Sequence, residues 1–333
     1  MKNTTQTLNK KDGVSNFCKT GLPILIIIIA IIVCIILITQ LNKTSTKSHK
    51  DTFTIKQRPG PKIPYELYKT GPYSYETLPH SIQTVMDISA KHFAAKIRYY
   101  DDVECRRLIE QNFEPNVLKA YDMLIPSAFK ADLWRYCVLY LYGGIYSDIG
   151  HRLLEDFQIN PDGEEGPDMI LVKDRPIVES KSSITDAAIP SSGGANNSIQ
   201  ISFIATIPKN NFLKYVIDNV VKDILARRYN RGVLDITGPA AFGRIFSHFF
   251  QYENDMDTSF VEPKKLTGLD GKTYKISIPL RQSHTWGEDG DQLEDIKTNK
   301  VIVKTKINNY RQLVYKNKRP HYNELYQKHL VYK

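Results

Sequence analysis

Apolar and polar positions in residues 62–333 follow two alternating periods, which predicts strands and helices in turn. Strand-like runs, rich in β-branched and aromatic residues, cover 96–100, 145–149, 169–172, 198–207 and 301–303. Helix-like runs cover 90–95, 103–113 and 211–229. Alternation of this kind predicts an α/β sheet covered by helices on both faces.

The clearest predicted helix covers residues 128–142, which contain no Gly or Pro and are apolar almost all round. Ser127 is its expected N-cap, and Gly143-Gly144 ends it in the usual C-terminal manner. Asp132 and Arg135 are three residues apart, so they share one face of this helix. They form either a buried structural ion pair or a polar clamp for a ligand that carries hydroxyl groups.

Two acidic positions follow predicted strands. Asp101-Asp102 follows the strand at 96–100, and Asp148 lies near the end of the strand at 145–149. Ligands of open α/β sheets bind beyond the carboxyl ends of strands, which favours these carboxylates as site residues. Asp148 is suited to hold a divalent cation that bridges phosphates. The alternative for each acid is a solvated loop carboxylate.

Residues 22–41 are uncharged and long enough to span a bilayer as one helix. The apolar run exceeds that of a usual signal peptide and no small-residue cleavage site follows, so an uncleaved anchor is expected. Lysines flank the segment on both sides, and the positive-inside rule therefore does not fix its orientation. The expected organisation is a tail at 1–21, a transmembrane helix at 22–41, a polar stem at 42–61 and a folded domain at 62–333.

The net charge of +9 comes from 45 basic and 36 acidic residues. Residues 1–62 carry ten of the basic and two of the acidic residues, which leaves 35 against 34 for the remainder. A nearly neutral folded part argues against a nucleic-acid partner. Cys105 and Cys137 are either a disulfide in an oxidising compartment or two buried free thiols.

The stretch Ala131-Asp132-x-x-Arg135, followed by Gly143-Gly144-x-Tyr146-x-Asp148, resembles the signature of DXD-motif sugar-nucleotide glycosyltransferases. This group includes glycosyltransferase family 32, with its initiating α-1,6-mannosyltransferases and α-1,4-galactosyltransferases. Downstream, Thr237-Gly238-Pro239 and His284-Thr285-Trp286 also fit the family pattern. Independently of the resemblance, Thr237 is expected to cap a helix whose first turn holds Pro239.

The resemblance implies a GT-A nucleotide-diphosphosugar transferase fold with a mixed central sheet, a retaining reaction and a Mn²⁺ or Mg²⁺ cofactor. The implied catalytic residues are Asp148, Asp132 and Arg135. The implied donor-binding residues are Asp132, Arg135, Tyr146, Asp148, Asp101, Asp102 and Trp286. The implied metal ligands are Asp148 and His284, with His151 as a weaker candidate.

One departure from the family pattern concerns the metal. The second acid of the DXD motif is replaced, because the triplet here is Asp148-Ile149-Gly150. His151 or His284 completes a metal site, or Asp148 suffices alone, or catalysis is weakened or lost.

The predicted function is a type II membrane hexosyltransferase of the Golgi or secretory pathway, with its catalytic domain in the lumen. It uses a UDP- or GDP-hexose donor and a glycan or glycolipid acceptor. Two alternatives stay open. One is a glycan- or nucleotide-sugar-binding pseudoenzyme of the same fold, and the other is a structural membrane glycoprotein.

Overall fold

The computed structural model describes residues 62–160, 162, 165–174, 198–229, 232–252, 260–284, 290–307, 313 and 320–333. The chain divides into two units, Met1–Thr54 and Ile55–Lys333, and all described residues belong to the second. Among the helices of these residues, none combines the length and apolarity needed to cross a bilayer. The predicted tail, transmembrane helix and stem lie outside the described residues.

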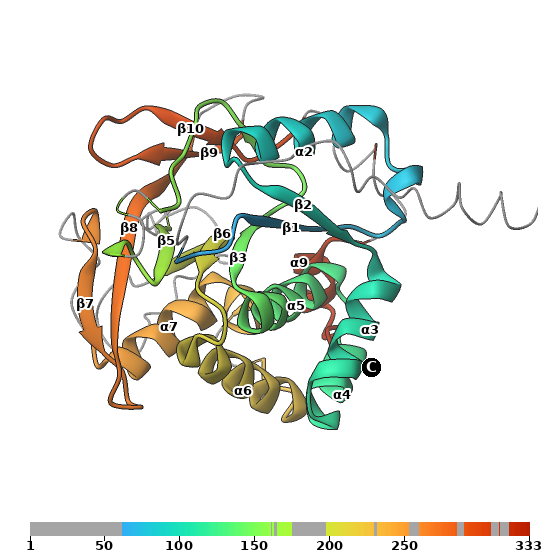
Figure 1. Cartoon of the computed structure of the whole chain (residues 1–333). Helices are drawn as coiled ribbons and strands as arrows, with labels where there is room; N and C mark the ends of the chain where they lie inside the picture. The colour runs from blue at the N-terminus through green and yellow to red at the C-terminus, as the bar shows by residue number, and fades with distance from the viewer. Residues whose placement is uncertain are drawn as a thin grey trace, which may run out of the picture. The chain divides into compact units, whose positions relative to one another are not determined.

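The described strands form one mixed sheet in the order β2-β1-β3-β6-β5-β8-β9-β10-β4, and β7 pairs with β8 at its side (Figure 1). Strand β1 runs parallel to β2 and β3, whereas β3 and β6 are antiparallel. The predicted mixed central sheet is thereby confirmed. The strands are β1 (Glu66–Thr70), β2 (Lys96–Tyr100), β3 (Gly144–Ser147), β4 (Arg152–Leu153), β5 (Met169–Lys173), β6 (Ile199–Thr206), β7 (Lys264–Thr267), β8 (Thr273–His284), β9 (Asp291–Asp295) and β10 (Val301–Lys304).

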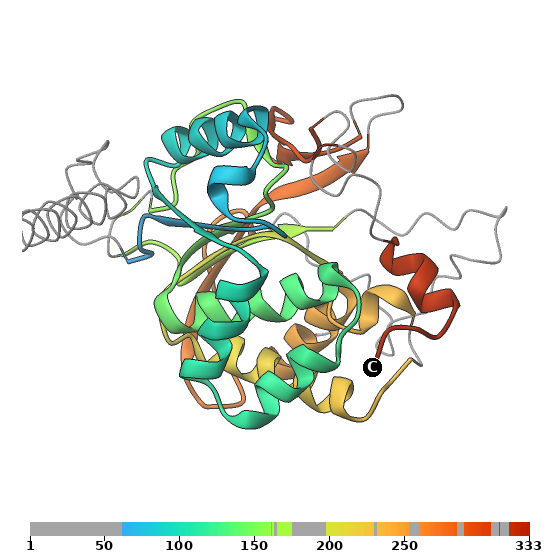
Figure 2. The same cartoon turned by 90° about the vertical axis from the view of Figure 1, so that its right-hand side faces the viewer.

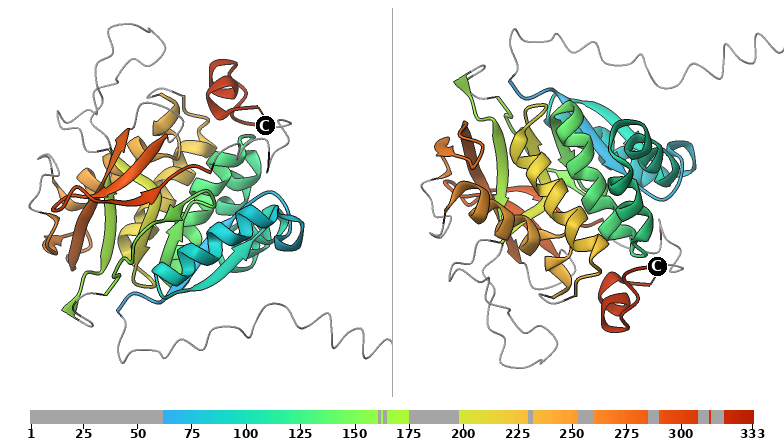
Figure 3. Two further views of the ribbon diagram at one scale, coloured as in Figure 1. Left: turned by 90° about the horizontal axis from the view of Figure 1, so that it is seen from above. Right: turned by 90° about the horizontal axis from the view of Figure 1, so that it is seen from below.

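Helices cover both faces of this sheet, as predicted. Helix α2 lies on one face, and helices α3 to α7 lie on the other (Figure 2). Helices α5 and α6 lie side by side beneath the strands (Figure 3) and build the larger apolar core. The helices are α2 (His80–His92), α3 (Asp102–Asn112), α4 (Pro115–Met123), α5 (Ser127–Tyr142), α6 (Asn211–Leu225), α7 (Pro239–Phe250) and α9 (Tyr322–Gln327), with short 3-10 turns η1 (Tyr75–Thr77) and η3 (Val233–Asp235).

Helix α5 matches the prediction except at its start. Pro126 occupies the N-cap position, and Ser127 is already helical. At the other end Gly143 and Gly144 have φ values of 62° and 95°, which only glycine adopts without strain. A Cβ on Gly143 would lie 2.5 Å from the backbone nitrogen of Pro208. The two glycines therefore allow the chain to leave α5 and enter β3 within one residue.

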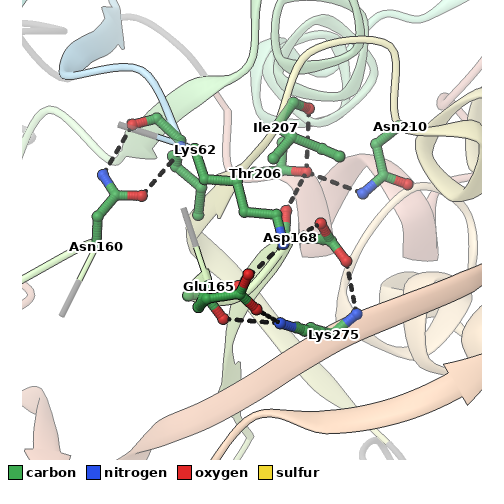
Figure 4. Close-up of polar contacts among 10 residues, drawn as sticks. Lys62, Asn160, Glu165, Asp168, Thr206, Ile207, Asn210 and Lys275 are labelled. Atoms are coloured by element: carbon green, nitrogen blue, oxygen red, sulfur yellow. Dashed lines mark hydrogen bonds and ion pairs between the residues drawn. The ribbon is translucent and has the colours of Figure 1, made fainter. Parts of the chain in front are cut away.

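A polar network fixes the amino-terminal edge of the sheet (Figure 4). The amine of Lys62, just before β1, lies 2.9 Å from the Asp168 carboxylate. Asp168 in turn accepts from the backbone nitrogen of Lys275 on β8 at 2.6 Å. The side-chain amide of Asn160 exchanges two hydrogen bonds with the backbone of Ile63, each 2.9 Å long. These contacts lie at the edge opposite the carboxyl ends of β1, β2 and β3, where the candidate acids are found.

Candidate active site

The acid and the guanidinium predicted to share a face of α5 form a buried ion pair. Arg135 Nη2 lies 2.8 Å from Asp132 Oδ1, and the two residues are 5% and 8% exposed. The second carboxylate oxygen of Asp132 accepts a 2.7 Å hydrogen bond from the hydroxyl of Thr237, which is fully buried. Both oxygens of this carboxylate are therefore engaged, which offsets the cost of burying a charge.

Thr237 does not cap α7, contrary to the prediction. Gly238 is the N-cap residue, and Pro239 is the first helical residue. The Thr237 hydroxyl turns to Asp132, and its carbonyl accepts a 2.7 Å hydrogen bond from Tyr136. The local pattern predicted a cap that accepts from backbone N–H groups, but in the fold the hydroxyl donates to a buried carboxylate 105 positions earlier in the chain.

Asp148 joins the same cluster from the sheet. Strand β3 ends at Ser147, and the Asp148 backbone nitrogen donates to the Ser202 carbonyl at 2.9 Å. Asp148 Oδ1 accepts from the Tyr146 hydroxyl at 2.8 Å and lies 3.5 Å from Arg135 Nη2. The Asp148 side chain is 41% exposed, and no described residue donates to its Oδ2. The structure thus brings Asp132, Arg135 and Asp148 together and leaves one acceptor atom facing solvent.

Nearly all N–H groups of the Arg135 guanidinium have acceptors within the protein. Besides the two carboxylates it donates through Nη1 to the Ile201 carbonyl at 2.6 Å and through Nε, more weakly, to Ala131 at 3.4 Å. Its guanidinium carbon lies 4.4 Å from the centroid of the Tyr146 ring. One of the five N–H groups has no described acceptor. The described geometry therefore indicates that Arg135 organises the cluster, while direct contact with a donor sugar stays a prediction.

Burial and charge shift the pKa values in this cluster. Burial raises the pKa of the Asp132 carboxyl, and Arg135 and Thr237 oppose that shift. Burial also raises the pKa of the Tyr146 hydroxyl well above its ordinary value, so this hydroxyl stays protonated and donates to Asp148. Burial alone would lower the pKa of Arg135, but its negative surroundings raise it, and the guanidinium stays charged.

The Asp148–His151 turn is supported from inside the protein. The backbone nitrogen of His151 donates to the Asp148 carbonyl at 2.9 Å. The His151 ring is 1% exposed, and its Nδ1 lies 3.0 Å from the Ser147 hydroxyl. Burial lowers the pKa of this imidazole to about 3, so it is neutral at physiological pH. These contacts indicate a structural role for His151, and its ligation of a metal stays a prediction that they do not support.

Lys69 lies beneath the same turn, and the sequence patterns did not single it out. This residue of β1 is fully buried, and its amine donates to the Asp148 carbonyl at 2.9 Å. Burial lowers the pKa of the amine to about 7, although Asp148 opposes the shift. The strand reads Glu66-Leu67-Tyr68-Lys69-Thr70, which is not an apolar run, so the local sequence carried no signal that this lysine would be buried.

Asp101 and Asp102 lie at the same edge of the sheet, because β2, β1 and β3 are parallel neighbours. Two strand spacings, roughly 10 Å, separate the end of β2 from that of β3. Asp101 is the N-cap of α3 and forms a capping box with Glu104, accepting from the backbone nitrogens of Val103 and Glu104. Asp101 therefore has a local structural role, and donor contacts of both aspartates stay predictions.

Two predicted residues are not placed by side chain. His284 is the last residue of β8, where its backbone pairs with Asp291, but its side chain lies outside the described residues. Trp286 also lies outside them.

Cys105 and Cys137 are both buried free thiols, so the two cysteines do not form a disulfide.

The described residues do not by themselves fit a divalent metal. Nowhere in that part of the chain do three His, Cys, Asp or Glu side chains gather closely enough to hold an ion. Gly150 offers no ligand, and a Cβ there would lie 3.3 Å from the Thr305 carbonyl, so the backbone just after β10 borders the place of the missing acid. Asp148 Oδ2 is the one open carboxylate oxygen of the described cluster.

Comparison with known proteins agrees with this geometry. Residues 77–171 match the family described as glycosyltransferase sugar-binding region containing DXD motif. The match includes α5, β3 and the Asp148–His151 turn, and it ends before Thr237. The resemblance to DXD-motif sugar-nucleotide glycosyltransferases is thereby confirmed, over less than a third of the chain.

Individual relatives carry related names. An uncharacterized glycosyltransferase of Acanthamoeba polyphaga mimivirus is 32% identical over 88 residues, 26% of this chain and 35% of that protein. The initiation-specific alpha-1,6-mannosyltransferase of Candida albicans is 46% identical over 50 residues, 14% of this chain and 13% of that protein. The chain thus spans well under half the length of either relative. The solved structure of PaToxG glycosyltransferase is 14% identical, with a TM-score of 0.38 over 58% of this chain and 71% of that chain.

Proposed function

We propose that this protein is a glycosyltransferase that moves a hexose from a nucleotide-diphosphate sugar to a glycan or glycolipid acceptor. The observation that carries the proposal is the convergence of Asp132, Arg135 and Asp148 at the carboxyl edge of a mixed sheet. These residues lie within the segment that matches the glycosyltransferase sugar-binding region. The parallel order of β2, β1 and β3 supports a GT-A type of fold with the nucleotide bound beyond these strand ends.

The described side chains suggest how the site handles a donor. Tyr146 and Arg135 hold Oδ1 of Asp148, which leaves Oδ2 directed to solvent as an acceptor for ribose or sugar hydroxyls. Asp132 keeps Arg135 in place through the 2.8 Å ion pair. Because these groups are fixed before the donor arrives, little reorganisation accompanies binding.

The finer features of the proposal come from the resemblance. They are retention of the anomeric configuration, closure over the donor by Trp286, and contact of His284 with the leaving diphosphate. A divalent ion, if bound, would supply charge stabilisation to that diphosphate. Proton NMR of the glycoside product distinguishes retention from inversion by the coupling constant of its anomeric proton.

The membrane placement is part of the proposal. Residues 22–41 would anchor a type II protein whose catalytic domain faces the Golgi lumen. Protease treatment of intact membrane vesicles tests this directly. A protected catalytic domain is expected, and cleavage of that domain before detergent is added would contradict the orientation.

A second candidate is a binding protein of the same fold without turnover. The observation that favours it is Gly150, which replaces the second acid of the motif. Tight binding of a nucleotide sugar without release of free nucleotide would support this candidate over the enzyme.

The deciding experiment uses the full chain in detergent with a panel of UDP- and GDP-hexoses and Mn²⁺. Release of nucleotide is expected for one donor, together with a loss of at least about a hundredfold in Asp148→Asn. Asp218→Asn is the matched control, because this carboxylate is an exposed member of a surface pair on α6. Such pairs contribute little to stability. Equal rates in the two variants would contradict the proposed role of Asp148.

A further inference from the structure

The positive charges around Asp148 come from the protein itself. Arg135 Nη2 lies 3.5 Å from its carboxylate, and the Lys69 amine lies 2.9 Å from its carbonyl. The ion pair with Asp132 holds Arg135 from the other side. When the Lys69 amine is protonated, these four groups comprise two cations and two carboxylates. A divalent ion at Asp148 would therefore enter a cluster whose negative charge is already matched.

Ligands for such an ion are also scarce among the described residues. Asp148 offers one open oxygen, Gly150 offers none, and the His151 ring is buried against Ser147. The Thr305 carbonyl borders Gly150, and the Thr305 backbone nitrogen donates to the Asp291 carbonyl. Asp291 in turn pairs with His284 between β9 and β8. The side chain of His284 lies outside the described residues, so it is not counted among these ligands.

Lys69 is costly at its position unless its charge has a use. Lys69 is fully buried in β1, so its amine has lost its hydration, and one backbone carbonyl is its single described acceptor. An apolar side chain of the same length would avoid the penalty of burying an ammonium group. The amine donates to the backbone carbonyl of Asp148, whose carboxylate is partly exposed at the proposed donor site. Lys69 therefore lies directly behind that site.

We propose that the donor site binds a nucleoside diphosphate without a divalent metal, and that Lys69 is a positioning residue which supplies positive charge beneath the Asp148–His151 turn. This inference rests on the proposed function. Lys69 is fully buried and does not touch the donor. It acts by fixing the Asp148 carbonyl and by making the electrostatic potential above the turn favourable for the diphosphate.

Calorimetric titration of the full chain in detergent tests the metal requirement. UDP- and GDP-hexoses are titrated in EDTA and again in Mn²⁺. Dissociation constants that agree within about threefold are expected. A requirement for Mn²⁺ of tenfold or more overturns this inference and leaves the proposed function standing. Absence of binding in both buffers overturns both this inference and the proposed function.

Substitution of Lys69 tests its part. Lys69→Met is expected to fold with an unchanged or higher Tm and to weaken UDP or GDP binding by at least about tenfold, because the electrostatic potential above the turn loses one positive charge. Binding of uridine or guanosine, which lack the diphosphate, is expected to stay unchanged. An equal loss for nucleoside and nucleotide would show a merely structural role and overturn the assignment.

Two further variants complete the test. Lys69→Arg retains the charge and is expected to recover part of the diphosphate affinity. Lys96→Met is the matched control, because this lysine is exposed at the start of the neighbouring strand β2. Diphosphate affinity that Lys69→Met leaves unchanged, or that Lys96→Met lowers equally, contradicts the proposal.

Discussion

The buried ion pair on α5 permits a double-mutant test of what holds the site together. Asp132 and Arg135 are 8% and 5% exposed and 2.8 Å apart. Arg135→Met leaves the Asp132 carboxylate buried with Thr237 as its described donor. Removal of one partner of a buried pair destabilises a protein by about 3–5 kcal/mol. That loss is a large fraction of the total stability of an ordinary domain.

The double variant should behave differently. Asp132→Asn is close in shape to aspartate and still accepts a hydrogen bond from Thr237, but it carries no charge. In Asp132→Asn/Arg135→Met no buried charge is left alone, so most of the lost stability should return, with a coupling energy of about 2–3 kcal/mol. Donor binding should stay lost, because Arg135 no longer holds Asp148.

The pH dependence of Arg135→Met has a defined sign. Burial raises the pKa of Asp132, and Arg135 is the largest influence that opposes the shift. Without Arg135 the folded-state pKa rises further above the unfolded value of about 4. Stability is then retained at low pH, where the carboxyl is protonated in both states, and is lost as the pH rises above about 4. The free energy of unfolding of Arg135→Met should therefore fall further below that of the double variant at pH 8 than at pH 5.

Urea unfolding followed by tryptophan fluorescence measures these differences. Trp134 is fully buried and packs against Tyr100 and Tyr146, so it reports on this region. If Arg135→Met costs less than about 1 kcal/mol, or if the double variant loses as much as the sum of the singles, the described pair is not the element that secures the site.

Three other predictions concern neighbouring residues. His151→Asn should reduce the fall in unfolding free energy between pH 7 and pH 5 by about 2 kcal/mol. The wild-type imidazole has a folded pKa of about 3 and an unfolded pKa near 6.5, so wild-type stability is lost as the pH falls through that window. An unchanged pH profile in the variant would contradict a buried neutral ring. Thr237→Val should cost about 1–3 kcal/mol, since it removes the hydroxyl that donates to Asp132, and thermal unfolding that matches wild type would refute this contact. Gly143→Ala should cost at least about 2 kcal/mol more than Gly271→Ala in urea titrations, because both glycines have positive φ but only the first has backbone atoms within 3 Å of an added Cβ.

The sequence by itself determined the local parts of this site. The helix predicted at 128–142, its glycine terminus and the strand predicted at 145–149 follow from patterns that span a few residues, and the observed bounds differ by one or two residues. The shared face of Asp132 and Arg135 follows from helical spacing alone. These features are encoded locally because periodicity and glycine conformations act within a turn or two of the chain.

The tertiary structure alone decided which distant groups complete the site. Thr237 meets Asp132 across 105 positions, and Lys69 meets Asp148 across 79. It also decided that Thr237 turns inward and that His151 is buried. Such contacts depend on which strands pair and in what register, and one sequence does not encode that choice within any local window. A buried charge is satisfied by whichever partner the complete fold brings within reach.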